Sequence, residues 1–325
     1  MSLLIASLQA FGWLVVLGLA SEFLAKGAEL LEHKFGAGFT GSVILGFITM
    51  LPELIFVLIA VNEMEYDVAL GSAVGGNILL FTVGYGIVIL IAYLKHDEII
   101  QLPRTMKDDL WYLIIATLYL FFSSFKGYFG LIDGLILFVL YIVFAIHQYV
   151  ETKDLQKNEN HDKEIITSKM WIKNSTFMLI GTIGIVVAAE PFVHSIIEIS
   201  HETGVSAIIL ALIISPIASE MPEKISAFSL SFKSLKGAEI AVANFIGSKV
   251  QASTLLFGSM ILFKLYLTGG EVYYVSHTFI LIIFAVLTTL VGVWITYDLK
   301  LKLKEGYFVT LLYLVAMISI ILLSD

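Results

Sequence analysis

The chain has 325 residues, of which 58% are hydrophobic and only 14% are charged, and its mean hydropathy is +0.94. Soluble domains carry about a quarter charged residues, so this composition excludes an ordinary soluble enzyme and a disordered chain. The net charge of -8 argues against nucleic-acid binding, and the absence of cysteine excludes disulfides and thiolate metal sites. The class that remains is a polytopic membrane protein, since each apolar run of roughly 20 residues can span a bilayer.

Long apolar runs predict about ten membrane-spanning helices. In chain order, the spans of the first half are expected near residues 7–30, 38–61, 68–93, 110–125 and 128–149. Those of the second half are expected near residues 174–198, 205–231, 237–266, 275–297 and 306–323. Open sheets cannot cross lipid and the sequence has no strands of alternating polarity, so the expected fold class is all-α.

A polar segment at residues 151–173 separates the two sets of spans. We therefore expect a five-helix repeat at 1–150, a hydrophilic loop, and a second five-helix repeat at 174–325. Fourteen of the 19 Lys and Arg residues fall on the same side as this loop, and the opposite side holds only Lys126 and Lys264. Positive loops face the cytoplasm, so the bias predicts a multi-pass cell-membrane protein with a cytoplasmic central loop and two extracellular termini.

The two halves of the sequence are similar to each other. VILGFITMLPELIF aligns with IISPIASEMPEKIS and places Glu53 opposite Glu223. GSAVGGNILLFTVGYG aligns with ANFIGSKVQASTLLFG and places Thr82 opposite Thr254. An odd number of spans in each half gives the second half the opposite orientation, which predicts an inverted repeat. Secondary transporters built in this way bind their substrate near the bilayer midplane, between the repeats.

Glu53 and Glu223 are the central candidates for a cation site, because a carboxylate within a membrane span is costly and usually functional. Thr49 and Ser219 precede them by four residues, which places hydroxyl and carboxylate on one helical face. Glu220 lies three residues before Glu223, and two such carboxylates cannot both be charged cheaply without a cation. These hard oxygen ligands suit Ca²⁺ better than a soft metal.

Neutral oxygens follow in the second motif of each half. Ser248 and Gln251 supply them in the second half, and Asn77 is their nearest polar counterpart in the first. Lys249 also lies within a predicted span. It either pairs with a site carboxylate as a resident cation or extends its ammonium group along an aqueous crevice.

Other chemistry has little support in the sequence. Glu190 and His194 are four residues apart, and we interpret them as a helix-end cluster rather than a proton relay. The sequence has no phosphate-binding loop, catalytic triad or dinucleotide fingerprint. We therefore expect neither an enzyme nor an ATP-driven pump, and no cofactor.

These motifs resemble the cation/calcium exchanger superfamily over essentially the whole chain. TMLPEL and AVGGNILL are similar to its first alpha repeat, and PIASEMPEK and FIGSKVQAS to its second. The resemblance implies an antiporter with two inverted repeats, in which Glu53 and Glu223 match the paired glutamates that coordinate calcium in alternating access. Thr49 and Ser219 match hydroxyl-bearing positions of the sodium/calcium branch.

The sequence departs from that sodium/calcium branch at several positions where the branch has polar or small hydroxyl residues. The resemblance therefore implies a loss of sodium ligands. The segment PIASEMPE is similar to the proton-coupled branch, and so is a Gln shortly after Gly-Ser, here Gln251. The positions that differ from the sodium/calcium branch are Met50, Gly76, Leu80, Glu220 and Ala252.

We expect antiport of Ca²⁺ against H⁺, since two protonatable glutamates balance the charge of one calcium ion. Coupling to Na⁺ is the alternative, and a divalent-cation channel is the less favoured third interpretation. The expected partners are these ions and the lipid bilayer, with no nucleic acid. The sequence leaves open the coupling ion, the preference for Ca²⁺ over other divalent cations, and the oligomeric state.

Overall fold

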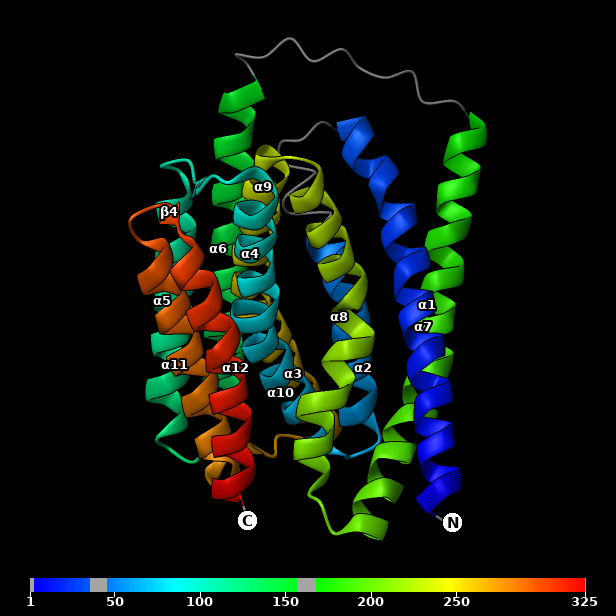
Figure 1. Cartoon of the computed structure of the whole chain (residues 1–325). Coiled ribbons are helices and arrows are strands. Elements are labelled where there is room, and N and C mark those ends of the chain that lie inside the picture. Colours follow the sequence, from blue (N-terminus) through cyan, green and yellow to red (C-terminus); the bar gives the residue numbers. More distant parts are fainter. Residues whose placement is uncertain (1–2, 36–45, 157–167, 325) are drawn as a thin grey trace. The chain divides into compact units, whose positions relative to one another are not determined.

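A computed structural model describes residues 3–35, 46–156 and 168–324, and most of them are helical (Figure 1). The α-helices are α1 (Leu3–Phe35), α2 (Gly46–Asn62), α3 (Tyr66–Leu79), α4 (Tyr85–His96), α5 (Met106–Ser124), α6 (Leu131–Gln156), α7 (Ser168–Thr203), α8 (Ala207–Lys233), α9 (Leu235–Gln251), α10 (Phe257–Leu267), α11 (Phe279–Thr296) and α12 (Leu303–Ser324). Shorter elements are the π-helical turns η2 (Leu80–Gly84) and η3 (Ala252–Leu256), the 3-10 turn η4 (Ser276–Thr278), and the strands β1 (Ile100–Gln101), β2 (Tyr128–Phe129), β3 (Tyr273–Tyr274) and β4 (Lys300–Leu301).

Seven segments of the described chain are long and apolar enough to cross a bilayer, as expected of a multi-pass membrane protein. They are Leu3–Gly27, Tyr66–His96, Leu131–Glu151, Met170–Thr203, Leu235–Leu267, Phe279–Thr296 and Leu303–Leu322. The helices α2 and α8 contain shorter apolar stretches, Met50–Asn62 and Ala207–Met221. The helical fold is confirmed, whereas the ten crossings stay a prediction.

Helices enter the polar segment 151–173 from both ends. The helix α6 continues to Gln156 and α7 begins at Ser168, while residues 157–167 lie outside the described chain. Both helices therefore extend beyond the apolar runs that predicted them. A polar helix end in water keeps its backbone hydrogen bonds but has no apolar stripe, so hydropathy does not detect it.

The described residues form two compact units, each of which takes helices from both halves of the sequence. Unit 1 consists of Met1–Ser72 and Tyr141–Glu223, and unit 2 of Ala73–Leu140 and Lys224–Asp325. The boundaries fall within α3, α6 and α8. Each compact unit thus combines parts of both halves, and the division into repeats at 1–150 and 174–325 stays a prediction.

In unit 1, α1 packs along α7, and small residues set the close approach of the two helices (Figure 1). A Cβ atom on Gly181 would lie 2.6 Å from both the Ala20 carbonyl oxygen and the Leu24 amide nitrogen. Small residues at such crossings let helix backbones approach within a membrane. The helix α2 also packs on α7, where the rings of Phe56 and Phe192 lie 5.7 Å apart.

Unit 2 contains two short antiparallel strand pairs, β1 with β4 and β2 with β3. The first aligns Ile100 with Leu301, and the second aligns Phe129 with Tyr273. Each pair joins a loop of the first half of the sequence to a loop of the second. The backbone groups of these loops are thereby hydrogen-bonded at the ends of the helices.

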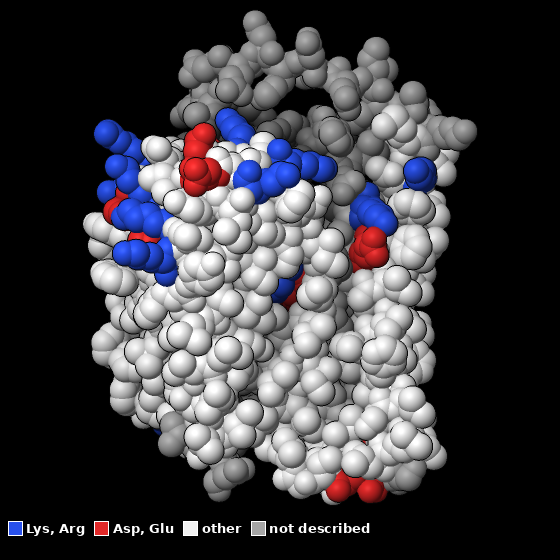
Figure 2. Space-filling model, in the orientation of Figure 1, with Lys and Arg blue, Asp and Glu red and all other residues white. Residues whose placement is uncertain are grey.

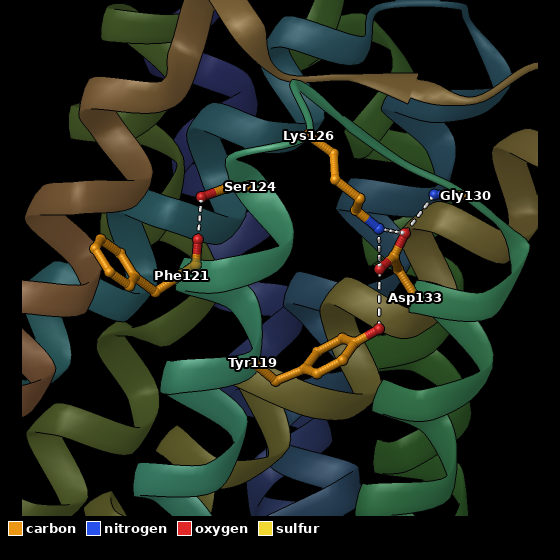
Figure 3. Close-up of polar contacts among 6 residues, drawn as sticks. All are labelled: Tyr119, Phe121, Ser124, Lys126, Gly130 and Asp133. Atoms are coloured by element: carbon orange, nitrogen blue, oxygen red, sulfur yellow. Dashed lines mark hydrogen bonds and ion pairs between the residues drawn. The ribbon is translucent and has the colours of Figure 1, made fainter.

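An ion pair between the half-exposed Lys126 and the buried Asp133 fixes the turn between α5 and α6, also in unit 2 (Figure 3). Figure 3 shows Lys126 and Asp133 facing each other, and the ammonium group donates to both carboxylate oxygens at 2.7 Å. The Gly130 N–H (2.8 Å) and the Tyr119 hydroxyl (2.9 Å) also donate to this carboxylate. An acidic group in the first turn of a helix satisfies free N–H groups and interacts favourably with the helix dipole. The Ser124 hydroxyl in the same view donates to the Phe121 carbonyl at 2.6 Å.

Candidate cation site

The first carboxylate of the predicted site, Glu53, lies in α2 of unit 1 and is only 5% exposed. It directly follows Pro52, which has no N–H to donate to the carbonyl four residues earlier, that of Ile48. A freed carbonyl and a carboxylate thus occur in one turn of a buried helix. Thr49 lies one turn before Glu53 in α2, and only its backbone is described.

The other two carboxylates lie in α8 of the same unit. Glu220 is 8% exposed and Glu223 is half-buried. Ser219 is also buried, and its hydroxyl donates to the Ser215 carbonyl at 3.2 Å. Because a hydroxyl oxygen that donates its proton keeps its lone pairs, Ser219 remains able to ligate a cation.

Carboxylates this deep in apolar surroundings need compensation. A buried ionised carboxylate is stable only when it is paired, hydrogen-bonded or bound to a cation, and otherwise it takes up a proton. Unit 1 places two nine-tenths buried carboxylates, Glu53 and Glu220, on helices that also carry Glu223 and Ser219. Each of these carboxylates is therefore paired with another group, bound to a cation or protonated.

Three other neutral ligands predicted from the sequence lie in unit 2 and are buried. Asn77 is in α3, and Ser248 and Gln251 are in α9. The Asn77 side chain donates to the Ala73 carbonyl at 2.9 Å and accepts from the Ser253 hydroxyl at 3.2 Å. Among the described atoms, the side-chain carbonyl oxygen of Gln251 has no hydrogen-bond donor, which leaves it suited to a cation.

Lys249 is fully buried in α9 of unit 2. Its ammonium group donates to the main-chain carbonyl of Asn77 and lies 5.3 Å from the centre of the Phe81 ring. A carbonyl and an aromatic face both stabilise a buried cation. Complete burial does not fit a side chain extended along an aqueous crevice, and the pairing of Lys249 with a site carboxylate stays a prediction.

The helices α3 and α9, which carry the buried polar residues Asn77 and Gln251, each end in a π-helical turn. The turn η2 follows α3, and η3 follows α9. In each turn a threonine hydroxyl donates to the carbonyl four residues earlier, Thr82 to Ile78 (2.5 Å) and Thr254 to Val250 (2.6 Å). Single π-turns within α-helices frequently occur at functional sites. In the sequence, the alignment of Thr82 with Thr254 pointed to these two positions. An alignment does not predict that the backbone there forms a π-helical turn.

A small cavity of about 20 Å³ lies beside Asn77 and Ser253 in unit 2. Two threonines that sequence reasoning did not single out, Thr117 and Thr289, also line it. The Thr117 hydroxyl is buried and has no hydrogen-bond partner among the described residues. A cavity of this size with several polar groups is large enough for one water molecule.

The structure thus divides the predicted site residues into two groups, one in each unit. Within unit 1 the carboxylates and hydroxyls lie on two helices, and within unit 2 direct contacts join Asn77 to Lys249 and to Ser253. The unit 1 group is Thr49, Glu53, Ser219, Glu220 and Glu223, and the unit 2 group is Asn77, Ser248, Lys249 and Gln251.

The chain is similar to known proteins in sequence. The family model for the sodium/calcium exchanger protein matches residues 6–150 and 174–322. An uncharacterized membrane protein, MJ0091 of Methanocaldococcus jannaschii, is 24% identical over 241 residues, which cover 73% of this chain and 75% of that protein.

Two solved structures share the fold. The H⁺/Ca²⁺ exchanger CAX superposes with a TM-score of 0.83 at 20% identity, covering 98% of this chain and 86% of that one. The sodium-calcium exchanger NCX_Mj superposes with a TM-score of 0.66 at 19% identity, covering 98% of this chain and 99% of that one.

Proposed function

This chain belongs to the sodium/calcium exchanger protein family, and from that membership we propose that it exchanges Ca²⁺ for H⁺ as a secondary-active antiporter. The observation that carries the proposal is the set of three carboxylates in unit 1, of which Glu53 and Glu220 are buried and Glu223 is half-buried. Their oxygens suit a hard divalent cation. The same oxygens take up protons when the cation leaves, because charged carboxylates in this environment are costly.

In the proposed cycle, Glu53 and Glu223 alternately hold Ca²⁺ or protons while the protein opens to one side of the membrane and then to the other. Two carboxylates balance one divalent cation, so exchange for two protons leaves the site's charge unchanged. Glu220 adds a third negative group on α8. The proposed neutral oxygen ligands are Thr49, Asn77, Ser219, Ser248 and Gln251.

Several positions favour protons over Na⁺ as the coupling ion. The side chains of Leu80 and Ala252 are apolar and buried, and Gly76 has no side chain. The resemblance to the sodium/calcium branch predicts polar ligands at these three positions. The loss of polar side chains at these positions removes ligands that Na⁺ would use, whereas protons bind to the carboxylates themselves. The fold similarity to CAX, an H⁺/Ca²⁺ exchanger by its description, agrees with this choice but does not decide it.

We further propose ten membrane crossings arranged as two inverted repeats. Equivalent elements at a constant separation support this architecture. The turn η3 begins 172 residues after η2, and Gly258 follows Gly86 by the same interval. Gly86 packs against Gly306 of α12, and Gly258 packs against Gly134 of α6. Gly306 in turn follows Gly134 by 172 residues, so the same helix contact occurs twice.

The distribution of charge supports the proposed orientation. Figure 2 shows Lys and Arg side chains gathered at the end of unit 2 where β4 lies. The loop after α4 and the loop after α11 meet there through the β1–β4 pair, and they carry Arg104, Lys300 and Lys302. Positive loops stay in the cytoplasm, so we assign this end to the cytoplasm and both termini to the outside of the cell membrane.

Transport by the purified protein in liposomes tests the proposal. With an acidic interior, external Ca²⁺ should accumulate inside, and collapsing the pH gradient with a protonophore should stop the uptake. Uptake that follows an outward sodium gradient at clamped pH would instead establish the Na⁺-coupled alternative. Flux driven by voltage alone would establish a channel, and absence of Ca²⁺ flux under every gradient would overturn the proposal.

A further inference from the structure

A histidine and two glutamates of unit 1 meet away from the carboxylates discussed above. Glu190 and His194 lie one turn apart on α7, and Glu63 follows α2. One ligand atom from each of the three lies within 4.8 Å of the others. Nε2 of His194 is 3.7 Å from a carboxylate oxygen of Glu63. The cluster is accessible, since the His194 side chain is 55% exposed and that of Glu63 26% exposed.

The backbone holds Glu63 firmly at this place. The Glu65 N–H donates to the Ala60 carbonyl at 2.9 Å, and the Met64 N–H donates to the Val61 carbonyl at 3.0 Å. With Met64 at φ 63°, these two bonds form a Schellman motif in which Glu63 is the C-cap residue of α2. Glycine usually occupies the left-handed position of this motif, whereas Met64 occupies it here. The two hydrogen bonds hold the turn in this conformation although methionine is unfavourable there.

A neighbouring amide orients the Glu63 carboxylate. The Asn62 side chain donates to one of its oxygens at 3.2 Å, and His194 lies near the other. Metal-binding carboxylates are commonly held by a second hydrogen bond of this kind. On α7, Glu190 and His194 are spaced by four residues, so both side chains project from the same face.

We propose that Glu63, Glu190 and His194 form a second, peripheral binding site for a divalent transition-metal ion such as Zn²⁺ or Co²⁺. One imidazole nitrogen and two carboxylate oxygens suit these ions, whereas Ca²⁺ takes only oxygen ligands. Metal–ligand bonds of about 2.0–2.2 Å place tetrahedral ligand atoms about 3.4 Å apart, close to the present separation of His194 from Glu63. Binding of one ion by all three would require the exposed Glu190 and His194 side chains to rotate toward it.

This site differs from the proposed transport site because it includes a histidine nitrogen. Its residues also lie at other positions along the chain than Glu53, Glu220 and Glu223. Glu190 lies before the C-terminal part of α7, and Pro191 follows it directly within the helix. An ion bound here joins α7 to the end of α2, two elements that already pack together in unit 1. We therefore infer that the metal tightens this contact rather than being transported.

Co²⁺ titration of the detergent-purified protein in excess Ca²⁺ tests the site. The visible absorption of Co²⁺ reports nitrogen and oxygen ligation, and excess Ca²⁺ occupies sites made of oxygens alone. The wild type should bind one Co²⁺, and H194A and E190Q should each weaken binding by at least about tenfold, since even losing a supporting residue costs that much. E271Q, which changes an exposed glutamate outside the cluster, is the matched control and should bind like the wild type.

A second background separates this site from transport. In E53Q, whose proposed transport site is disabled, Co²⁺ binding should persist with the wild-type affinity. Its loss in E53Q would assign the signal to the transport site and overturn the proposal. Equal Co²⁺ binding by wild type and H194A would overturn the proposal as well. Because the His194 and Glu190 side chains are exposed, we expect their substitution to leave the fold intact.

Discussion

The ammonium group of Lys249 donates a hydrogen bond to the main-chain carbonyl of Asn77, a residue 172 positions earlier in the chain. This separation equals the one that relates η2 to η3. Lys249 therefore takes, in the second half of the sequence, the position that Asn77 has in the first. One half has an amide side chain at this position and the other a lysine, so the two halves differ chemically within their most similar motif.

Replacing Lys249 tests whether its charge affects exchange. K249M removes the cation and the bond to Asn77, and it should destabilise the protein by about 1–3 kcal/mol, the cost of losing a buried charged hydrogen bond. If Lys249 is the resident cation, the pH profile of Ca²⁺ uptake should also shift. Lys264 provides a matched control, since it is 5% exposed and lies 4.9 Å from the Tyr273 ring. K264M should lower the melting temperature without moving the profile, and an unmoved profile in K249M would give Lys249 a structural role only.

Neutralising the central carboxylates should stop exchange. E53Q and E223Q keep the side-chain volume but remove the charge that binds Ca²⁺ and the group that takes up protons. Ca²⁺ uptake into liposomes should fall to the level of protein-free vesicles, with an unchanged size-exclusion profile. E271Q, at an exposed position, should transport like the wild type. Wild-type flux from either of the first two variants would remove that glutamate from the mechanism.

The α1–α7 crossing predicts opposite effects for two glycines. In G181A the new Cβ meets the Ala20 and Leu24 backbone at 2.6 Å, and the overlap should cost about 1–3 kcal/mol. Gly18 on α1 has open space around its Cβ position, so G18A should gain up to about 1 kcal/mol from helix propensity. Melting temperatures in detergent measure both changes. A G181A protein as stable as G18A would show that the helices do not approach this closely.

The turn between α11 and α12 predicts a dependence on pH. Burial raises the pKa of Asp298, but hydrogen bonds from the Lys300 N–H (2.9 Å) and the Lys302 ammonium (3.2 Å) outweigh it and hold the pKa below its ordinary value. A lowered pKa stabilises the folded state above the unfolded-state pKa, and this contribution is lost as the pH falls through the folded-state pKa. Since the pair is exposed, the effect is small.

D298N should therefore melt slightly below the wild type at pH 7. The difference should close on acidification, as the wild-type carboxyl group becomes protonated. Melting curves of both proteins between neutral and acidic pH measure this. A difference that stays constant across the titration would mean that the charge of Asp298 does not stabilise the turn.

Hydropathy predicted the apolar parts of the helices well. It did not predict the polar helix ends that extend beyond the apolar runs. The expected span 110–125 corresponds to α5, which begins at Met106 with the polar residues Lys107, Asp108 and Asp109. These residues form a helical turn without an apolar stripe, so hydropathy could not detect it. The same reason explains the early start of α7 at Ser168.

Candidates for the site could be singled out because charged residues are rare in the apolar runs of this chain. Glu53, Glu220 and Lys249 stood out as charged residues in apolar runs, and the structure buries all three. The contact of His194 with Glu63 was not predictable, since it depends on how α7 packs against α2. Thr117 carried no signal either, because a lone threonine in an apolar helix ordinarily bonds to its own backbone.

The two strand pairs of unit 2 have a consequence for biosynthesis. β1 leaves the ribosome with the first half of the chain, yet Ile100 has no partner until Leu301 is synthesised. Between these events the translocon must release a set of helices whose connecting loops carry unpaired backbone groups. Unit 2 therefore completes its fold only after Leu301 has been synthesised, and a chain that stops before this residue should be degraded by quality-control proteases.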